Sequence, residues 1–325
     1  MAEYGGADRL ELVDVATPRP GPGEVLVRLA FAGVNYTDVY AREGVYARSR
    51  TYPTRLPMTL GMEGAGHAAA LGAGVEGLAE GDRVAYCLAP GSYAEYVAVP
   101  AWRLVRVPAN VPLGVATALM MQGSTAHYLT RSAYALGGSD TCLVHAGAGG
   151  VGQLLIQLAK ARGATVITTV GNERKADIAR SHGADHCVNY RTEDFVERVL
   201  ELSDGRGANV VYDSVGRDTI AGSLRCLRRR GLCVLFGASS GAVPAVDPLE
   251  LAEAGSVYFT RPHLADYMAR PEEVHGRADD LFRMLSEGLL EVMVHRELPL
   301  AEVPEAHRQL ERRATAGKLL IRVSE

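Results

Sequence analysis

The chain has 325 residues, a formal net charge of −4 and 47% hydrophobic residues, so its length suggests two domains and its composition is typical of a globular protein. It has no basic block of the kind that binds a nucleic-acid backbone, and no apolar run near the roughly 18 residues that cross a bilayer, which argues against both kinds of partner. The N-terminal segment 1–9 is polar and the five cysteines form no Cys-x-x-Cys pair, so we expect a cytoplasmic location and reduced thiols packed as small apolar side chains.

Short β-strands dominate the first third of the chain. Runs rich in β-branched residues stand at 24–29, 83–86 and 95–99, and glycine or proline residues bound them. Apolar and polar residues partly alternate within these runs, which is typical of strands with one solvated face. We therefore expect a compact, mainly antiparallel β domain here.

From about residue 113, strands alternate with helices. Apolar runs predict strands at 141–146, 165–170, 187–188, 210–213 and 232–236. Helical spacing predicts helices between them at 151–162, 173–182, 194–203 and 219–227. This alternation predicts βαβ units and a doubly wound parallel sheet, whose ligand lies beyond the carboxyl ends of the strands.

The final part of the chain contains two helical stretches, 274–290 and 303–313, and the apolar segment 317–323. A strand this apolar needs a sheet to join, and we assign it to the N-terminal β domain, which becomes discontinuous. The expected fold class is thus α/β, with residues 118–262 forming a Rossmann-type cofactor domain. Residues 1–117 and 263–325 would form the β domain.

The most informative motif is the glycine turn Gly147-Ala148-Gly149-Gly150-Val151-Gly152, which lies between a predicted strand and a predicted helix. In that setting the three spaced glycines permit a tight turn, a close approach of the backbone to a pyrophosphate, and close packing of helix on strand. The N–H groups of the first helical turn then face the phosphates. We expect Gly149, Gly150 and Val151 to contact a dinucleotide.

Residues after the second strand of this region favour NADPH over NADH. NAD sites carry an acidic residue there to bind the ribose hydroxyls, whereas this strand ends on Val170-Gly171-Asn172. Arg174 and Lys175 follow at the start of the next helix, where they suit a 2′-phosphate. We expect Gly171, Asn172 and both cations to hold it, with Tyr190 completing the floor of the pocket.

A resemblance to a known family rests on the segments 33–38, 61–66, 81–84, 91–96, 145–152, 212–218, 236–241 and 260–262. Over essentially its whole length the chain resembles the zinc-free quinone oxidoreductase (zeta-crystallin) branch of the medium-chain dehydrogenase/reductase superfamily, and bacterial NADPH:quinone reductases most of all. The resemblance implies a Rossmann cofactor domain, a GroES-like catalytic domain and NADPH-dependent reduction of quinones. Members usually begin with a short strand ahead of a segment like 3–6, so either that strand is absent here or the chain continues upstream.

The resemblance also implies that no metal is bound. Zinc alcohol dehydrogenases of the superfamily have a ligand cysteine where Asn35 stands and a ligand histidine where Met62 stands. An amide and a thioether do not replace a thiolate and an imidazole around Zn²⁺. Only Cys87 lies in the region of their structural zinc lobe. Hydride delivery in a cleft between the domains then carries the chemistry.

Further site residues follow from the resemblance by position. Asn35 is expected to donate a hydrogen bond to the acceptor oxygen, and Tyr40 or Tyr46 to orient the acceptor ring or pass a proton. The arginines at 42, 48, 50 and 55 suggest either a basic lip for an anionic or oxygen-rich acceptor or a solvated loop. The remaining positions expected to contact the cofactor are Tyr36, Gln122, Thr125, Tyr128, Ser214, Phe236, Gly237, Ala238, Ser239, Ser240, Phe259, Thr260, Arg261 and Arg313.

Three functions remain open. The first is an NADPH-dependent quinone reductase, and the second is a reductase of alkenes conjugated to a carbonyl, such as enals, enones or enoyl thioesters, with the same fold and cofactor. The third is a nonenzymatic, crystallin-like protein that binds NADPH or RNA, and the charge distribution argues against RNA. The expected partners are a small-molecule quinone or enone acceptor and a second copy of the chain, joined through the cofactor domain in a homodimer.

Overall fold

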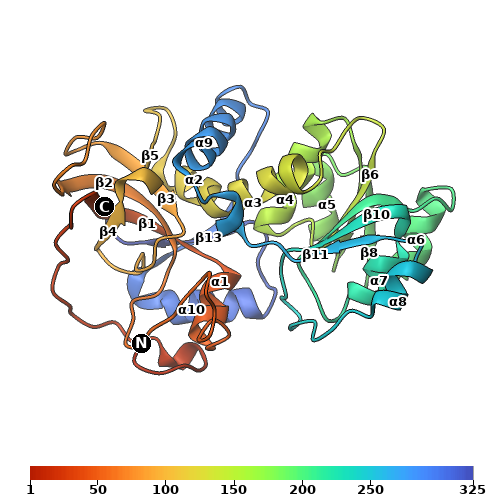
Figure 1. The fold of residues 1–325 in the computed structure, drawn as a ribbon, viewed down its shortest axis with the longest axis horizontal. Helices are drawn as coiled ribbons and strands as arrows, with labels where there is room; N and C mark the ends of the chain where they lie inside the picture. Colours follow the sequence, from red (N-terminus) through yellow and green to blue (C-terminus); the bar gives the residue numbers. More distant parts are fainter. Residues whose placement is uncertain (325) are drawn as a thin grey trace. The chain divides into compact units, whose positions relative to one another are not determined.

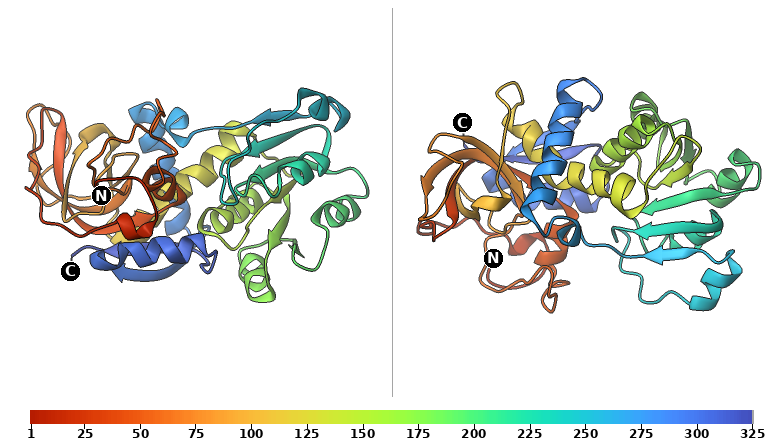
Figure 2. Two further views of the ribbon diagram at one scale, coloured as in Figure 1. Left: turned by 90° about the horizontal axis from the view of Figure 1, so that it is seen from below. Right: turned by 45° about the horizontal axis from the view of Figure 1, so that its top comes forward.

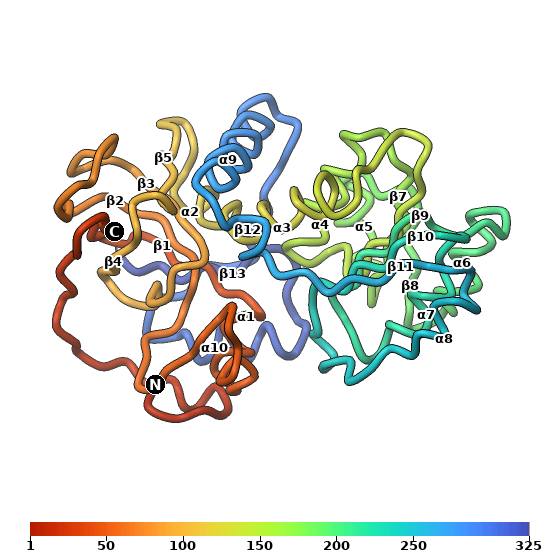
Figure 3. Tube along the Cα trace, in the orientation of Figure 1, coloured from red at the N-terminus to blue at the C-terminus, as the bar shows by residue number. Residues whose placement is uncertain are grey.

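The computed structural model describes residues 1–324, which form two compact units. The first unit comprises residues 1–124, 268–286 and the chain from 292 onwards, and the second comprises residues 125–267 and 287–291. Figure 3 traces the chain by colour from the first unit to the second and back. The division predicted after 117 and after 262 differs from these boundaries, because residues 118–124 belong with the first unit and residues 263–267 and 287–291 with the second.

A seven-stranded sheet forms the framework of the first unit (Figure 1). Its order is β12-β13-β1-β2-β3-β5, with β4 paired to β1 off this path, and all neighbours are antiparallel except β12 and β13. The strands are β1 Glu24–Val34, β2 Glu63–Leu71, β3 Arg83–Cys87, β4 Tyr96–Pro100, β5 Val105–Arg106, β12 Val294–Pro299 and β13 Lys318–Arg322. The predicted, mainly antiparallel β domain is confirmed.

The C-terminal strand β13 runs antiparallel to β1, with Leu319 opposite Val34 and Arg322 opposite Phe31. The prediction that the apolar C-terminal segment joins the N-terminal β domain is therefore confirmed. In Figure 2 the blue C-terminal segment and the red and orange N-terminal strands lie in the same unit. Alternate residues of β1, such as Val25 and Val27, point into the buried core, as the pleat of a strand requires.

The helices of the first unit are α1 Tyr36–Arg42, α2 Leu113–Ala118, α9 Pro271–Ser286 and α10 Val303–Glu311. The sequence did not predict α1 or α2, because six or seven residues are too few to reveal a helical period. α1 begins after Asn35, whose N–H group donates to the Asp38 carboxylate at 2.9 Å. Among the helices of residues 1–324, none is both long and apolar enough to span a bilayer.

The second unit is built on a parallel six-stranded sheet of order β11-β10-β9-β6-β7-β8. Helices α4 and α5 cover one face of this sheet, and α6 and α7 cover the other (Figures 1 and 2). The strands are β6 Thr141–Val144, β7 Thr165–Val170, β8 His186–Asn189, β9 Ala208–Asp213, β10 Leu227–Leu235 and β11 Tyr258–Thr260. The helices are α3 Ser124–Tyr128, α4 Gly150–Ala161, α5 Glu173–Ser181, α6 Phe195–Leu202, α7 Ile220–Arg225 and α8 Pro248–Glu253. The predicted doubly wound parallel sheet is confirmed.

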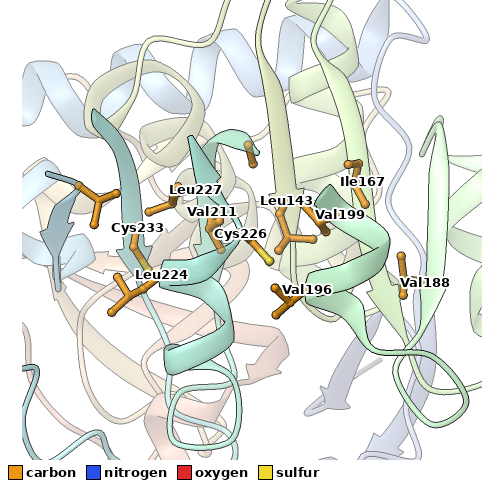
Figure 4. Close-up of a cluster of buried hydrophobic side chains, with 12 residues drawn as sticks. Leu143, Ile167, Val188, Val196, Val199, Val211, Leu224, Cys226, Leu227 and Cys233 are labelled. Carbon is orange, nitrogen blue, oxygen red and sulfur yellow. The ribbon is translucent and has the colours of Figure 1, made fainter. Parts of the chain in front are cut away.

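One side of this sheet forms a core with α6 and α7, drawn in Figure 4. Leu143, Val211 and Cys233 come from three neighbouring strands and are fully buried there, together with Val199 of α6 and Leu224 of α7. Burying a large aliphatic side chain stabilises a fold by about 1.5–3 kcal/mol. This packing holds the carboxyl ends of the strands in place, where the ligand of such a sheet binds.

β10 is longer than predicted. It begins at Leu227, whereas the sequence indicated a strand only from residue 232. Its first part contains Arg228–Arg230, and Arg230 has a positive φ of 57°, while the register against β9 shifts between Leu227 and Leu232. These polar residues interrupt the apolar run, which explains why the pattern did not reveal this part of the strand.

Candidate active site

The glycine turn connects β6 to α4 in the second unit. Its left-handed residue is not a glycine but Ala146, with φ of 57°. The Gly149 N–H group donates to the Ala146 carbonyl at 2.9 Å, and α4 begins at the next residue, so Gly150 and Val151 form its first turn. A Cβ on Gly152 would overlap the Ala146 carbonyl oxygen, which is why helix and strand pack this closely only with glycine there. The turn presents backbone N–H groups at the start of a twelve-residue helix, as a pyrophosphate requires.

The end of β7 lies beside this turn and carries no carboxylate. Asn172 caps α5 by accepting from the Lys175 N–H group at 3.0 Å. The nearby acid Glu173 is paired with Arg180 at 2.6 Å, and Arg174 is exposed. Tyr190 lies over Gly171, its hydroxyl oxygen 2.7 Å from where a Cβ on that glycine would stand. The residues predicted to hold the 2′-phosphate therefore lie together. Their contact with that phosphate stays a prediction.

Two loops after β9 and β10 bring together more of the predicted cofactor residues. The Ser214 carbonyl accepts from the Ser239 N–H group at 3.1 Å, and the Val215 carbonyl accepts from the Ser240 N–H group at 2.8 Å. Both loops follow the carboxyl ends of adjacent parallel strands. The predicted cofactor residues in these two loops are Ser214, Phe236, Gly237, Ala238, Ser239 and Ser240. Phe259 and Thr260 lie in β11, and Arg261 follows it. Their contact with a cofactor stays a prediction.

The other predicted cofactor residues are spread over both units. Tyr128 is buried in the second unit and its ring stacks on that of Tyr267 at 4.3 Å, near Thr125 on the same helix. Gln122 lies in the π-helical turn Leu119–Gly123 of the first unit. Tyr36 and Arg313 lie near each other in the first unit: burial raises the pKa of Tyr36 to about 12, while the charge of Arg313 opposes that rise.

A cluster of tyrosine rings surrounds the predicted catalytic tyrosines. The ring centroids of Tyr40 and Tyr46 lie 5.9 Å apart in an edge-to-face arrangement, and those of Tyr36 and Tyr40 lie 6.0 Å apart. The structure adds Tyr52, whose ring is 5.2 Å from that of Tyr46. The sequence analysis missed Tyr52, although the spacing of residues 40, 46 and 52 was a usable signal. Tyr46 and Tyr52 are buried, whereas Tyr36 and Tyr40 are partly exposed, so these two rings present the accessible part of the cluster.

Asn35 lies in a buried polar cluster, with 7% of its surface exposed. Its amide nitrogen donates to Glu63 Oε2 at 2.9 Å and, more weakly, to the Gly33 carbonyl oxygen at 3.4 Å. Its Oδ1 accepts from Lys318 Nζ at 2.8 Å. Both amide hydrogens and the amide oxygen are therefore used within the chain. The predicted donation to an acceptor oxygen stays a prediction, and it requires one of these bonds to open.

The buried ion pair of Glu63 and Lys318 completes this cluster. The two side chains are 0% and 1% exposed, and Glu63 Oε1 also accepts from the Met121 N–H group at 2.6 Å. A Cβ on Gly33 would overlap the Glu63 carboxylate, so the pair requires glycine at that position. The sequence analysis missed this pair. The usable signal was a lysine in an apolar strand, because a buried ammonium group needs an anion.

Asp38 is fully buried at the start of α1. Its Oδ2 accepts from the Asn35 N–H group and from the Tyr93 hydroxyl, both at 2.9 Å. Its Oδ1 has no hydrogen-bond partner in the part of the chain that the structure describes. Burial raises the pKa of Asp38 to about 7, although both hydrogen bonds and the Lys318 charge oppose that rise.

From Tyr93 the hydrogen bonds continue to His307 and Arg42. The Tyr93 hydroxyl lies 3.2 Å from His307 Nε2, and Arg42 donates to His307 Nδ1 at 3.2 Å. An arginine only donates, so Nδ1 accepts and Nε2 carries the hydrogen. Burial, with the Arg42 charge adding to it, lowers the pKa of His307 to about 3. His307 is therefore neutral in this network at neutral pH.

The four arginines of the predicted basic lip fall into two groups. Arg42 is 1% exposed and pairs with Glu311 at 2.6 Å, so the prediction that it belongs to an exposed basic loop is wrong. Its partner Glu311 lies 269 residues further along the chain, so no local pattern reveals the pair. Arg48, Arg50 and Arg55 are exposed, and no ion pair joins them to another residue between 1 and 324.

The donors of the first unit do not fit a zinc ion. No group of three or more His, Cys, Asp or Glu side chains that could hold a metal occurs in residues 1–324. Asn35 is engaged with Glu63 and Lys318, and Met62 offers only a thioether. Burial raises the pKa of the Cys87 thiol, which favours the protonated form over the thiolate that binds zinc.

Two family models match this chain, one in each of its two units. The family model described as "Alcohol dehydrogenase GroES-like domain" covers residues 21–109, and the one described as "Zinc-binding dehydrogenase" covers residues 150–271. A quinone oxidoreductase of Pseudomonas aeruginosa is 42% identical over 322 residues, which is 99% of this chain and 98% of the relative. A 2-haloacrylate reductase of a Burkholderia species is 38% identical over 98% of this chain and 96% of its own. The crystal structure of Escherichia coli quinone oxidoreductase complexed with NADPH has a TM-score of 0.95 at 40% identity, covering 99% of this chain and 98% of that chain.

Proposed function

The chain belongs to the medium-chain dehydrogenase/reductase superfamily, among its quinone oxidoreductases, and on this premise we propose that it is an enzyme that reduces quinones with NADPH. The observation that carries the proposal is 42% identity to a quinone oxidoreductase over 99% of the chain. The NADPH bound to the E. coli relative supports the same cofactor here. The family inferred from the sequence motifs is thereby confirmed.

The residues of this chain have distinct tasks in such a reaction. When bound, NADPH supplies the hydride. The N–H groups at the start of α4 suit the pyrophosphate, and Arg174 and Lys175 suit the 2′-phosphate. The tyrosine cluster gives a flat quinone a surface to pack on. Tyr40 is less buried than Tyr46, so we assign to its hydroxyl the transfer of the proton that two-electron reduction also needs.

Lys175→Ala is expected to raise the KM for NADPH at least about tenfold and to leave the KM for NADH nearly unchanged. The reason is that a charge-assisted bond to the 2′-phosphate contributes about 1.5–3 kcal/mol, and NADH has no such phosphate. Steady-state kinetics with both cofactors measures this. The control is Arg206→Ala, which removes an exposed cation that precedes β9, at the amino end of the strand. Equal effects of Lys175→Ala on both cofactors would contradict the assignment.

A screen of electron acceptors tests the function itself. NADPH oxidation is followed with quinones, enals and enoyl thioesters, while NADPH binding is measured separately. Faster oxidation with quinones than with conjugated alkenes is expected. If NADPH binds and no acceptor speeds its oxidation, both enzymatic proposals fail. That result would favour the alternative of a nonenzymatic protein that binds NADPH. The cytoplasmic location expected from the sequence stays a prediction.

Reduction of an anionic conjugated alkene is a second candidate, favoured by the exposed residues Arg48, Arg50 and Arg55. They follow Tyr46 and flank Tyr52 in the chain, and the relative at 38% identity is named for a substrate that carries a carboxylate. Unpaired exposed cations near an acceptor raise its local concentration when it is negatively charged.

Changing these three arginines to glutamine together is expected to lower kcat/KM for an anionic acceptor, such as 2-chloroacrylate or a sulfonated naphthoquinone, about tenfold at low salt. The value for an uncharged quinone should stay the same, and the difference should shrink as salt screens the charges. Changing Arg206, Arg225 and Arg229 of the second unit, which are exposed as well, is the matched control. The same loss with charged and uncharged acceptors would remove the case for anion selection.

We also propose that two copies associate through the second unit. β11 is an edge strand of its sheet. Tyr258 on this strand is 63% exposed, and Leu249 on α8 is 64% exposed. An edge strand has unpaired backbone groups that can bind another strand. Light scattering is expected to give about twice the 34.7 kDa of one chain, and a mass of one chain would contradict the proposal.

A further inference from the structure

A buried network joins the carboxyl ends of three adjacent strands in the second unit, and the proposed function does not yet use it. His145 follows β6, Thr169 lies in β7 and Asp213 ends β9. Ser223 of α7 connects His145 to Asp213. All four residues are at most 3% exposed.

The direction of each hydrogen bond in this network can be assigned from Asp213. The Ser223 hydroxyl donates to Asp213 Oδ2 at 2.7 Å, so its single hydrogen is used there. His145 Nε2, at 3.0 Å from the Ser223 oxygen, must therefore be the donor of that bond. Nε2 carries the hydrogen, and the neutral ring keeps Nδ1 as an acceptor.

The other side of the ring fits the same assignment. The Thr169 hydroxyl lies 2.9 Å from His145 Nδ1 and donates to it. The Thr169 oxygen then accepts from the Ala146 N–H group at 3.3 Å. Ala146 is the left-handed residue that opens the glycine turn. The network thus runs without conflict from the Ala146 N–H group to the Asp213 carboxylate.

At the other end of the network, Asp213 binds backbone N–H groups of the loop after β9. Its Oδ1 accepts from the Val215 and Gly216 N–H groups at 2.8 and 3.0 Å, and both carboxylate oxygens accept from the Thr219 hydroxyl. This loop contains Ser214, one of the predicted cofactor contacts. The network therefore ties the glycine turn to a second loop at the same edge of the sheet.

We propose that neutral His145, with Thr169, Ser223 and Asp213, is a positioning device that holds the glycine turn and the loop after β9 in the geometry that binds the dinucleotide. This inference rests on the proposed function for the identity of the dinucleotide. A protonated His145 would point a second hydrogen at Thr169, whose own hydrogen would then lack this acceptor. The network thus requires an uncharged ring.

The surroundings of His145 favour its uncharged form. Burial lowers the pKa of His145, while the Asp213 charge opposes this. The ring also packs edge-to-face against Phe195 of α6, with centroids 5.1 Å apart. The groups that face it from β7, α7 and α6 are thus two hydroxyls and an apolar ring, and the charge that acts on it comes from Asp213 of β9.

Thr169→Val tests the proposal, because it keeps the shape of the side chain and removes the hydroxyl between His145 and Ala146. The dissociation constant for NADPH, measured by cofactor fluorescence, is expected to rise about tenfold, and amide exchange at 145–149 should quicken. Thr130→Val is the matched control: Thr130 is equally buried in the same unit, but its hydroxyl donates to the Ala126 carbonyl within a helix. An unchanged dissociation constant in Thr169→Val would overturn the proposal.

A second measurement needs no substitution. Nitrogen NMR of the His145 ring in the intact protein is expected to show hydrogen on Nε2 alone at pH 7, with the pKa of the ring below its usual value. Hydrogen on Nδ1, or titration near the usual histidine pKa of about 6.5, would overturn the proposal. Both measurements are independent of the acceptor, so a failure of quinone reduction is distinguishable from a failure of this inference.

Discussion

Lys318→Met is expected to lower the free energy of unfolding of the first unit by about 3–5 kcal/mol, because it leaves the Glu63 carboxylate buried without its cation. Asn35 loses the partner of its Oδ1 in the same substitution. The two side chains are 0% and 1% exposed, so water cannot replace the lost ammonium group without opening the sheet. Urea unfolding followed by circular dichroism measures the effect.

Two variants sharpen this prediction. Arg322→Met removes an exposed cation from the same strand, whose pair with Glu297 lies at the surface, and should cost less than about 1 kcal/mol. Adding Glu63→Gln to Lys318→Met removes the unpaired charge and should recover part of the loss, because the amide oxygen can still accept from the Met121 N–H group. A loss in Lys318→Met no larger than that in Arg322→Met would show that the buried pair contributes little.

Asp38→Asn is expected to change how stability depends on pH. Folding raises the pKa of Asp38 from 3.8 to about 7, so the folded chain binds the proton more tightly than the unfolded chain does. The corresponding stabilisation is fully present below pH 4 and is lost as the pH rises through 7. A change of this size corresponds to about 4 kcal/mol. Above pH 7 the wild-type chain therefore carries an unfavourable buried charge that the asparagine variant lacks.

The measurement is urea unfolding of both proteins at several pH values between 4 and 8. Asp38→Asn should be the more stable of the two at pH 8, and its stability should fall less between pH 4 and 7. Its side-chain oxygen can still accept from the Asn35 N–H group and the Tyr93 hydroxyl. Asp82→Asn is the control, because the pKa of Asp82 is lowered and its titration lies below this range. Parallel pH curves for wild type and Asp38→Asn would contradict the prediction.

Much of the second unit could be predicted from the sequence because its signals are local. A glycine turn between an apolar strand and a helix of regular spacing is contained in about twenty residues, and β7 was found with the bounds that the structure has. The missing carboxylate after Val170 and the cations at 174 and 175 are equally local. The C-terminal strand was also assigned to its sheet correctly, since so apolar a segment had to be buried.

The first unit was less predictable because its important contacts join distant parts of the chain. The sequence predicts that Asn35 contacts the acceptor, but it does not reveal that the Asn35 amide also binds Glu63 and Lys318, which lie 28 and 283 residues away. Arg42 was grouped with exposed arginines, yet it is paired with Glu311, 269 residues further on. No periodicity in the sequence indicates which of many charged residues will be buried together.

The sequence by itself determined the fold class, the position of the glycine turn and the family, because each depends on residue types at short, regular spacing. Only the tertiary structure decided which polar side chains are buried and what they bind: the pair of Glu63 and Lys318, the raised pKa of Asp38, and the neutral His145 between Thr169 and Ser223. The physical reason is that a buried polar group is stable only with a partner, and in this chain the sheets bring those partners together from strands far apart in the sequence.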